Sequence, residues 1–233
     1  MEQEVKLTAT IPDTLDRVLE DTVVKQAALG KHPVEHPYVA TYYDTPSRDL
    51  LNAKLAFRLC SSNNIWRVAV KGNRDLEPGG VGRWEEWEEI IPEPVESWHD
   101  LPDGPVREQI TRILGKEGLA QKAMTPLLVT DIHRRALNLT ISKACFPLLY
   151  LQGNADSDPY AETVAELALD RGMIRADGKS RALFEVELEL KSGEFQPVKT
   201  LGEYLLNRFD LTPSRHSKFV LGLRLAGGSL SAF

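Results

Sequence analysis

The stretch Phe184-Glu185-Val186-Glu187-Leu188-Glu189-Leu190 alternates strictly between apolar and acidic residues. A repeat of two residues places one kind of side chain on each face of a β-strand, so this stretch predicts a strand with an acidic face. The same alternation marks seven further segments, and the eight predicted strands are 2–7, 38–43, 55–60, 66–71, 84–90, 129–141, 161–169 and 184–190. Strands therefore dominate the expected fold.

The connections between these strands favour an antiparallel arrangement. Helical spacing is clear only at 14–29, 105–114 and 197–209, so most strands lack the long helical crossover that parallel pairing needs. Asn63-Asn64 separates two strands and predicts a tight turn, because asparagine tolerates the left-handed conformation. Closing eight strands into a barrel removes exposed edges and encloses space for a small ligand. We therefore expect an α+β fold that is mainly antiparallel β: an eight-stranded closed barrel, or tunnel, with helices packed outside.

Two segments are predicted to be irregular. The segment 72–82 carries Pro78-Gly79-Gly80, which predicts a mobile loop. A short stretch rich in glycine and serine at 227–231 predicts a frayed end of the chain.

Composition and charge exclude several classes of protein. The chain has 233 residues, with 28 Lys and Arg against 34 Asp and Glu, so a general nucleic-acid coat protein is disfavoured. The two cysteines, Cys60 and Cys145, lie too far apart in sequence to suggest a zinc knuckle or a disulfide framework. No apolar run approaches the roughly 20 residues of a membrane-spanning helix, and the first residues do not resemble a signal segment. We expect a cytoplasmic protein with no nucleic-acid or membrane partner; the oligomeric state stays open.

Several predicted strands carry charges on alternate positions. Glu2, Glu4 and Lys6 share one face of the first strand. For any one strand, a solvated sheet face is the simpler explanation. However, like charges side by side repel and are best tolerated where an opposite charge or a cation faces them. Several such faces together favour a barrel whose polar side chains point inward into one cavity.

Such a cavity suits a metal-bound polyanion. Carboxylates two residues apart on a strand lie about 7 Å apart at the backbone, close enough to converge on one hard divalent cation. The pairs Glu2/Glu4 and Glu185/Glu187 are therefore candidates for a Mg²⁺ or Mn²⁺ site. Lys and Arg side chains facing that metal would hold phosphate oxygens.

A series of short motifs now stands out because of its order. It comprises ExExK at 2–6, YYDTP at 42–46, LAFRL at 55–59, VKG at 70–72, TDIHR at 130–134, ELALD at 166–170, EVELEL at 185–190 and SKF at 217–219. In this order the chain resembles the CYTH or triphosphate tunnel metalloenzyme family, and its C-terminal half resembles the bacterial inorganic triphosphatases of that family. The resemblance implies a tunnel domain over 1–225, followed by a flexible tail over 226–233.

The resemblance also implies roles for charged residues. The residues expected on the metal side are Glu2, Glu4, Glu185, Glu187 and Asp170. The residues expected to bind the triphosphate are Lys6, Arg58, Lys71, Arg134 and Lys218, with Lys6, Glu86 and Glu88 as the candidate catalytic groups.

Two residues depart from the pattern of the family. Cys60 stands where a second arginine is expected after Arg58, and Leu221 stands where an arginine often follows the Ser-Lys pair. Arg67, which shares a strand face with Lys71, is the candidate replacement for the missing guanidinium and is expected to bind substrate.

The leading hypothesis is the metal-dependent hydrolysis of inorganic triphosphate to pyrophosphate and phosphate. Hydrolysis of thiamine triphosphate or of a nucleoside triphosphate, or cyclisation of ATP, is the alternative within the family. A non-catalytic polyphosphate-binding protein is the alternative of another class, favoured if the two departures remove too much positive charge. Three tryptophans lie close together in the sequence: Trp66, Trp84 and Trp87. Such a cluster could stack on nucleic-acid bases, but we expect these side chains to pack in the barrel wall, because aromatic residues are favoured in strands.

Overall fold

The computed structural model describes residues 2–142 and 162–227, and the side chains of all of these except 73–76. Its strands are β1 (Glu2–Ala9), β2 (Val34–Asp44), β3 (Ala56–Ser62), β4 (Ile65–Glu77), β5 (Val81–Ile91), β6 (Thr125–Ile141), β7 (Thr163–Ala176), β8 (Lys179–Ser192) and β9 (Leu211–Pro213). The eight predicted strands are all present. Cys145, residue 161 of one predicted strand, and residues 228–233 of the predicted tail lie outside the described residues.

The strands form one closed antiparallel barrel. Around the wall they follow the order β5-β4-β3-β2-β6-β7-β8-β1, and β1 closes the ring by pairing with β5, with Glu2 opposite Trp84. The predicted eight-stranded barrel is therefore confirmed. The short strand β9 was not predicted; it pairs with the last residues of β1, beyond the point where β5 begins.

The β3–β4 hairpin turns where the sequence indicates. Asn63 and Asn64 both have positive φ, at 49° and 63°, and join Ser62 to its partner Ile65. This prediction is confirmed, because the two left-handed residues give the hairpin the twist of its strands.

The predicted loop at 72–82 is wrong. β4 continues to Glu77 and β5 begins at Val81, so that only Pro78–Gly80 turns the chain. The register shifts between Gly72 and Asp75, and this irregularity interrupts the alternation by which the sequence marks a strand.

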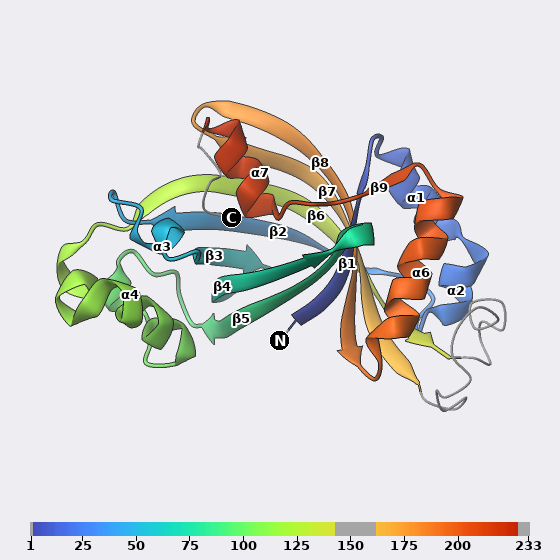
Figure 1. Ribbon diagram of the computed structural model, residues 1–233, viewed down its shortest axis with the longest axis horizontal. Helices are drawn as coiled ribbons and strands as arrows, with labels where there is room; N and C mark the ends of the chain where they lie inside the picture. Colours follow the sequence, from blue (N-terminus) through green and yellow to red (C-terminus); the bar gives the residue numbers. More distant parts are fainter. Residues whose placement is uncertain (1, 143–161, 228–233) are drawn as a thin grey trace.

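Two helical layers cover the outside of the barrel (Figure 1). Helices α1 (Asp13–Glu20), α2 (Thr22–Ala27) and α6 (Phe195–Arg208) pack on β1, β7 and β8 around a buried apolar cluster. The predicted single helix at 14–29 is divided, because the Asp21 carboxylate accepts hydrogen bonds from the backbone N–H groups of Val23 and Val24 and caps α2.

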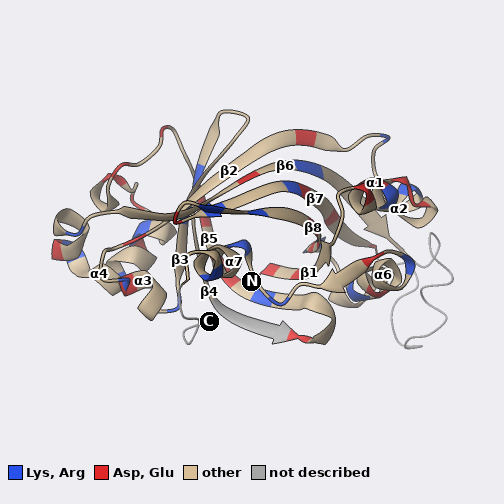
Figure 2. Ribbon diagram, turned by 90° about the horizontal axis from the view of Figure 1, so that it is seen from above, with Lys and Arg blue, Asp and Glu red and all other residues tan. Residues whose placement is uncertain are grey.

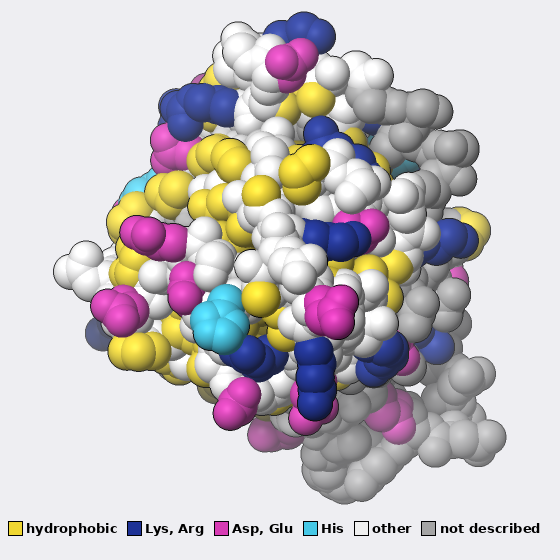
Figure 3. All heavy atoms as spheres, turned by 90° about the vertical axis from the view of Figure 1, so that its left-hand side faces the viewer, with side chains coloured by type: hydrophobic (Ala, Val, Ile, Leu, Met, Phe, Trp, Pro, Cys, Tyr) yellow, Lys and Arg dark blue, Asp and Glu magenta, His cyan; other side chains and the backbone are white. Residues whose placement is uncertain are grey.

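The second layer consists of α3 (Asp49–Asn52) and α4 (Pro105–Gln121), which cover the outer face of β3, β4 and β5. At the end of the molecule that carries these helices, side chains of both signs are scattered among apolar ones (Figure 3). No helix within the described ranges combines the length and the apolar character that crossing a bilayer requires.

One helix packs inside the barrel rather than outside. Helix α7 (Lys218–Leu225) places Phe219 against the ring of Tyr42, with 5.2 Å between ring centroids, and buries Leu221 in the same apolar cluster as Leu128. Thr130 and Arg134, which share the strand face of Leu128, line the interior cavity. The helix therefore fills part of one end of the barrel, and Leu221 serves this packing.

A buried aspartate fixes the chain between β2 and β3. The Asp44 carboxylate accepts hydrogen bonds from the backbone N–H groups of Thr45, Leu50 and Leu51 at 2.7–3.0 Å, and Asp44 is 1% exposed. The YYDTP motif thus has a structural function: its aspartate satisfies the first donors of α3.

We predict that Asp44→Ala lowers the free energy of unfolding by about 3 kcal/mol, because it leaves three backbone donors without their acceptor. Urea denaturation measures the effect. The control is Asp103→Ala, whose carboxylate is exposed and makes one ion pair with Arg107; we expect a loss below about 0.5 kcal/mol. Equal stability of the two variants would contradict this role for Asp44.

Candidate active site

The inward strand faces enclose a cavity of about 810 Å³. Residues from all eight barrel strands and from α7 line it, and lysine, arginine and acidic positions lie side by side across the strands (Figure 2). Most of the predicted site residues line this cavity: Glu2, Glu4, Lys6, Arg58, Arg67, Lys71, Glu86, Glu88, Arg134, Glu187 and Lys218. The other two, Asp170 and Glu185, are fully buried and contact Lys218, which lines the cavity.

Lys218 is the centre of the buried charges. Its Nζ lies 2.9 Å from Asp170 Oδ2, 2.7 Å from Glu185 Oε2 and 2.6 Å from Glu187 Oε1. Ser217 caps α7 by accepting a hydrogen bond from the N–H of Val220, which fixes the start of the helix that carries the lysine. Burial alone would lower the pKa of Lys218, but the three carboxylates outweigh burial and hold that pKa well above its usual range.

Two further cations complete this group. The Arg134 guanidinium binds both oxygens of Asp170 at 2.7 Å and donates to Glu187 Oε2 at 2.7 Å, and Lys6 Nζ lies 3.0 Å from Glu187 Oε1. Burial would raise the pKa of Glu187, but Lys218, Lys6 and Arg134 together hold it well below the ordinary value. We call these residues the inner cluster: Lys6, Arg134, Asp170, Glu185, Glu187 and Lys218.

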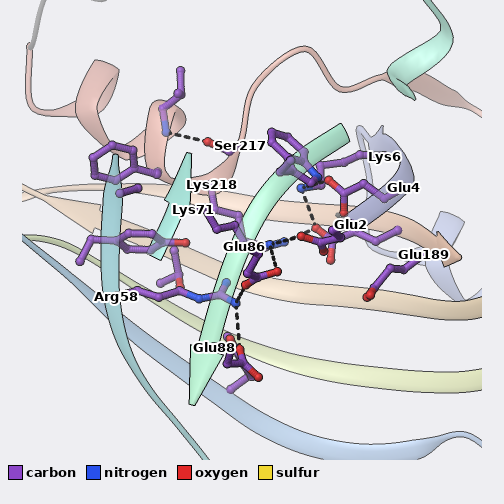
Figure 4. A pocket seen from close by; sticks show the side chains of 18 of the residues that line it. Glu2, Glu4, Lys6, Arg58, Lys71, Glu86, Glu88, Glu189, Ser217 and Lys218 are labelled. Atoms are coloured by element: carbon purple, nitrogen blue, oxygen red, sulfur yellow. Dashed lines mark hydrogen bonds and ion pairs between the residues drawn. The ribbon is translucent and has the colours of Figure 1, made fainter. Parts of the chain in front are cut away.

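A second network lies on β1, β3, β4 and β5. Lys71 Nζ is 2.7 Å from Glu2 Oε2 and 3.0 Å from Glu86 Oε2, and Arg58 Nη2 is 3.0 Å from Glu86 Oε1. Arg58 also approaches Glu88 at 3.4 Å. These side chains converge on one space with Glu4, Lys6 and Lys218 (Figure 4). Charges from segments distant in sequence therefore share one cavity.

Cys60 and Arg67 are direct partners across the β3–β4 pair. Directly paired residues of antiparallel strands point to the same face, so the two side chains are neighbours on the inner face. Cys60 is buried and carries no guanidinium, whereas Arg67 lines the cavity with its Nε 3.5 Å from Glu88 Oε1. The structure thus places a guanidinium one strand away from the position of the missing arginine.

Glu189 is a candidate metal ligand that sequence reasoning missed. It lies directly opposite Glu4 in the β1–β8 pair and lines the cavity, whereas Glu185 lies opposite Thr8 and is fully buried. Burial, and after it the charge of Glu2, raise the pKa of Glu189. Alternation placed all three glutamates of β8 on one face, but only the register between the two strands shows which of them face Glu2 and Glu4.

Two groups of carboxylates are candidates for holding a cation. Oxygens of Asp170, Glu185 and Glu187 lie within 4.8 Å of one another, but lysines and an arginine already neutralise them. Glu2, Glu4, Glu187 and Glu189 instead line the cavity. The Glu4 carboxylate is buried, and its Oε1 lies 3.0 Å from Lys6 Nζ. Carboxylate oxygens are the donors that Mg²⁺ and Mn²⁺ prefer, so this second group fits a divalent ion.

The three central tryptophans have different surroundings. Trp66 and Trp87 pack against the apolar cluster under α4, as expected for the barrel wall. Trp84 lines the cavity, with its ring centroid 5.4 Å from Lys6 Nζ and 6.0 Å from Lys71 Nζ. Its ring therefore faces cations, which favours cation–π contacts.

The closed barrel with a charged interior defines a tunnel protein. Residues 1–218 match the family model of the CYTH domain. The chain belongs to the CYTH family, as its motifs indicated. Members of this family depend on divalent metal ions.

The chain is similar to an inorganic triphosphatase of Haemophilus influenzae, at 25% identity over 189 residues that cover 79% of this chain and 45% of that protein. It thus spans about half the length of this curated relative. Among solved structures it is similar to a Hippeastrum protein described as a putative adenylyl cyclase with a dominant triphosphatase activity. The TM-score is 0.67 and the identity 20%, over 100% of this chain and 99% of that one. A Pyrococcus horikoshii protein gives a TM-score of 0.49 at 16% identity, over 95% and 98% of the two chains.

We predict that Asp170→Ala lowers the free energy of unfolding by about 3 kcal/mol, because it leaves two buried cations short of a carboxylate. Asp131→Ala is the matched control: Asp131 also pairs with an arginine, Arg175, but both side chains are about half exposed, so we expect a loss below about 1 kcal/mol. Urea denaturation compares them. If Asp170→Ala is no more destabilising than Asp131→Ala, the inner cluster does not stabilise the barrel.

Proposed function

We propose that this protein hydrolyses inorganic triphosphate to pyrophosphate and phosphate with a divalent metal ion, Mg²⁺ or Mn²⁺. The observation that carries the proposal is the cavity inside the barrel, in which Lys6, Lys71 and Arg58 alternate with carboxylates. Breaking these internal ion pairs would leave buried charges without partners. A guest avoids that cost only if it brings both a polyanion for the cations and a cation for the carboxylates. A metal-bound triphosphate is such a guest.

The aromatic side chains of the cavity favour an inorganic guest over an organic one. Tyr38 lies between two guanidinium groups, 5.9 Å from that of Arg58 and 5.3 Å from that of Arg134. The ring of Tyr42 stacks on Phe219. Trp84 likewise faces two lysines. Each of these rings is already engaged, so a nucleobase or a thiazole would have to displace an existing contact in order to stack.

The residues of the chain would divide the work as follows. Lys6, Arg58, Lys71, Arg134 and Lys218 would hold phosphate oxygens and stabilise the negative charge that grows on the leaving pyrophosphate. A divalent ion held by Glu2, Glu4, Glu187 and Glu189 would shield the phosphate charge from the attacking water.

An ionised carboxylate is also needed to orient that water. Burial raises the pKa of Glu86, but Lys71 and Arg58 outweigh it and lower the pKa below the ordinary value, so Glu86 is a carboxylate at neutral pH. It can accept a hydrogen bond from the attacking water. Glu88, next along the same inner face of β5, is the alternative.

We further propose that residues 1–225 form the tunnel domain and that the protein acts in the cytoplasm. The match of residues 1–218 to the CYTH domain supports the first statement. The second rests on the composition of the chain alone.

We predict that tripolyphosphate is hydrolysed in preference to thiamine triphosphate and ATP, and that a chelator stops the reaction. Glu4→Ala should lower the rate at least about 100-fold, because the cavity then lacks a carboxylate for the metal. A phosphate-release assay measures both effects. Glu93→Ala, which removes an exposed glutamate, serves as the control with unchanged activity. Full activity of Glu4→Ala would refute the role of this carboxylate, and tight binding without phosphate release would favour a polyphosphate-binding protein.

We predict that Arg67→Ala raises KM for tripolyphosphate about tenfold, the effect of losing one charge-assisted hydrogen bond. Adding Cys60→Arg to this variant should restore most of the affinity, because the new guanidinium would start from the neighbouring position on β3. Steady-state kinetics measure KM. An unchanged KM in Arg67→Ala would show that Arg67 does not replace the missing arginine.

A further inference from the structure

The cations of the cavity are not all neutralised. The lysines and arginines that line it are Lys6, Lys54, Arg58, Arg67, Lys71, Arg134, Lys191, Arg215 and Lys218. Among the side chains that the structure describes, each of these except Lys54 and Arg215 lies within 4.0 Å of a carboxylate oxygen. Within the described part of the cavity lining, these two therefore offer an anion an attraction that no carboxylate already offsets.

Lys54 and Arg215 both lie at the end of the barrel that α7 partly fills, and both are exposed where they line the cavity. Neighbouring strands of the ring are antiparallel, so the start of β3 lies at the same end as the last residues of β1. Lys54 stands two positions before the start of β3, and Arg215 follows β9, which pairs with those last residues of β1. The two unpaired cations thus border one mouth of the tunnel.

The backbone holds both residues in place. Lys54 adopts a left-handed conformation, and its N–H donates to the carbonyl of Leu51 at 3.0 Å. Next to Arg215, the N–H of Ser214 donates to the carbonyl of Lys6 at 2.9 Å. The backbone at both cationic side chains is therefore held in place, which reduces the conformational entropy lost when they bind an anion.

The opposite mouth has the other sign. There the cavity is lined by Glu2, Glu88, Glu166 and Glu189, on the strand ends away from α7. The cations at this end, Arg67 and Lys191, each lie close to one of these glutamates: Arg67 Nε is 3.5 Å from Glu88 and Lys191 Nζ is 2.7 Å from Glu189. A polyanion approaching this mouth meets carboxylates that repel it.

We infer that the two ends of the tunnel differ in charge, and that linear phosphate anions enter by the positively charged mouth that Lys54 and Arg215 border. The two side chains attract the approaching anion and pass it to the paired cations deeper in the cavity. This inference rests on the proposed function for the identity of the anion. Fixed charges at the mouth of a cleft raise association rates, and salt weakens the effect.

The test compares two variants that each remove positive charge while keeping side-chain bulk. Lys54→Gln with Arg215→Gln should lower the association rate of tripolyphosphate and kcat/KM at least about fivefold at low ionic strength, with kcat unchanged. Lys191→Gln, at the opposite mouth, is the control and should leave both values unchanged or raised. Stopped-flow tryptophan fluorescence gives the association rate, since Trp84 lines the cavity, and the difference should shrink as salt is raised.

The inference is overturned if the double variant associates as fast as the unaltered protein, or if Lys191→Gln slows association as much. A slower association in the double variant supports it even if no phosphate is released. Binding without release would reject the proposed hydrolysis alone, so the two ideas fail separately. Absence of any tripolyphosphate binding would overturn both.

Discussion

The contact of one lysine with three buried carboxylates constrains the rest of this molecule. Asp170 and Glu185 are inaccessible to solvent, and a buried carboxylate costs several kcal/mol unless a cation compensates it. Lys218 supplies that cation at 2.6–2.9 Å, but it belongs to α7, far along the chain from the strands it meets. The helix must therefore sit inside the barrel rather than on it. Phe219 and Leu221 then pack against the inner strand faces and fill part of one end of the tunnel.

The same principle governs the open part of the cavity. Closing the barrel removes every strand edge but turns charged faces inward, and the interior is stable because lysines, arginines and glutamates pair with one another. Removing the partner of a single charge in this lining would leave that charge buried and unpaired, at a cost in free energy. The lining accepts a guest that carries both signs, since each displaced side chain then finds a new partner.

Local patterns and non-local pairing explain what the sequence can and cannot predict here. Alternation depends on neighbours in the chain, so it correctly indicated the eight strands and the shared face of Glu2, Glu4 and Lys6. Register depends on contacts between strands, so the position of Glu189 opposite Glu4, and of Arg67 opposite Cys60, required the structure. Helix α7 was missed because its apolar residues lie all around it, as in a buried helix, and give no amphipathic signal.

If this protein is a tunnel enzyme, metal and phosphate meet inside the barrel, on the cavity-facing carboxylates and their neighbouring cations. A crystal structure of the protein with Mn²⁺ and tripolyphosphate, with the metal located by its anomalous scattering, shows where both bind. We expect a metal peak between Glu4 and the carboxylates of β8 that line the cavity, with phosphate oxygens on Lys6 and Lys71. A metal bound only at the outer surface, or phosphate lying outside the barrel, would contradict this expectation.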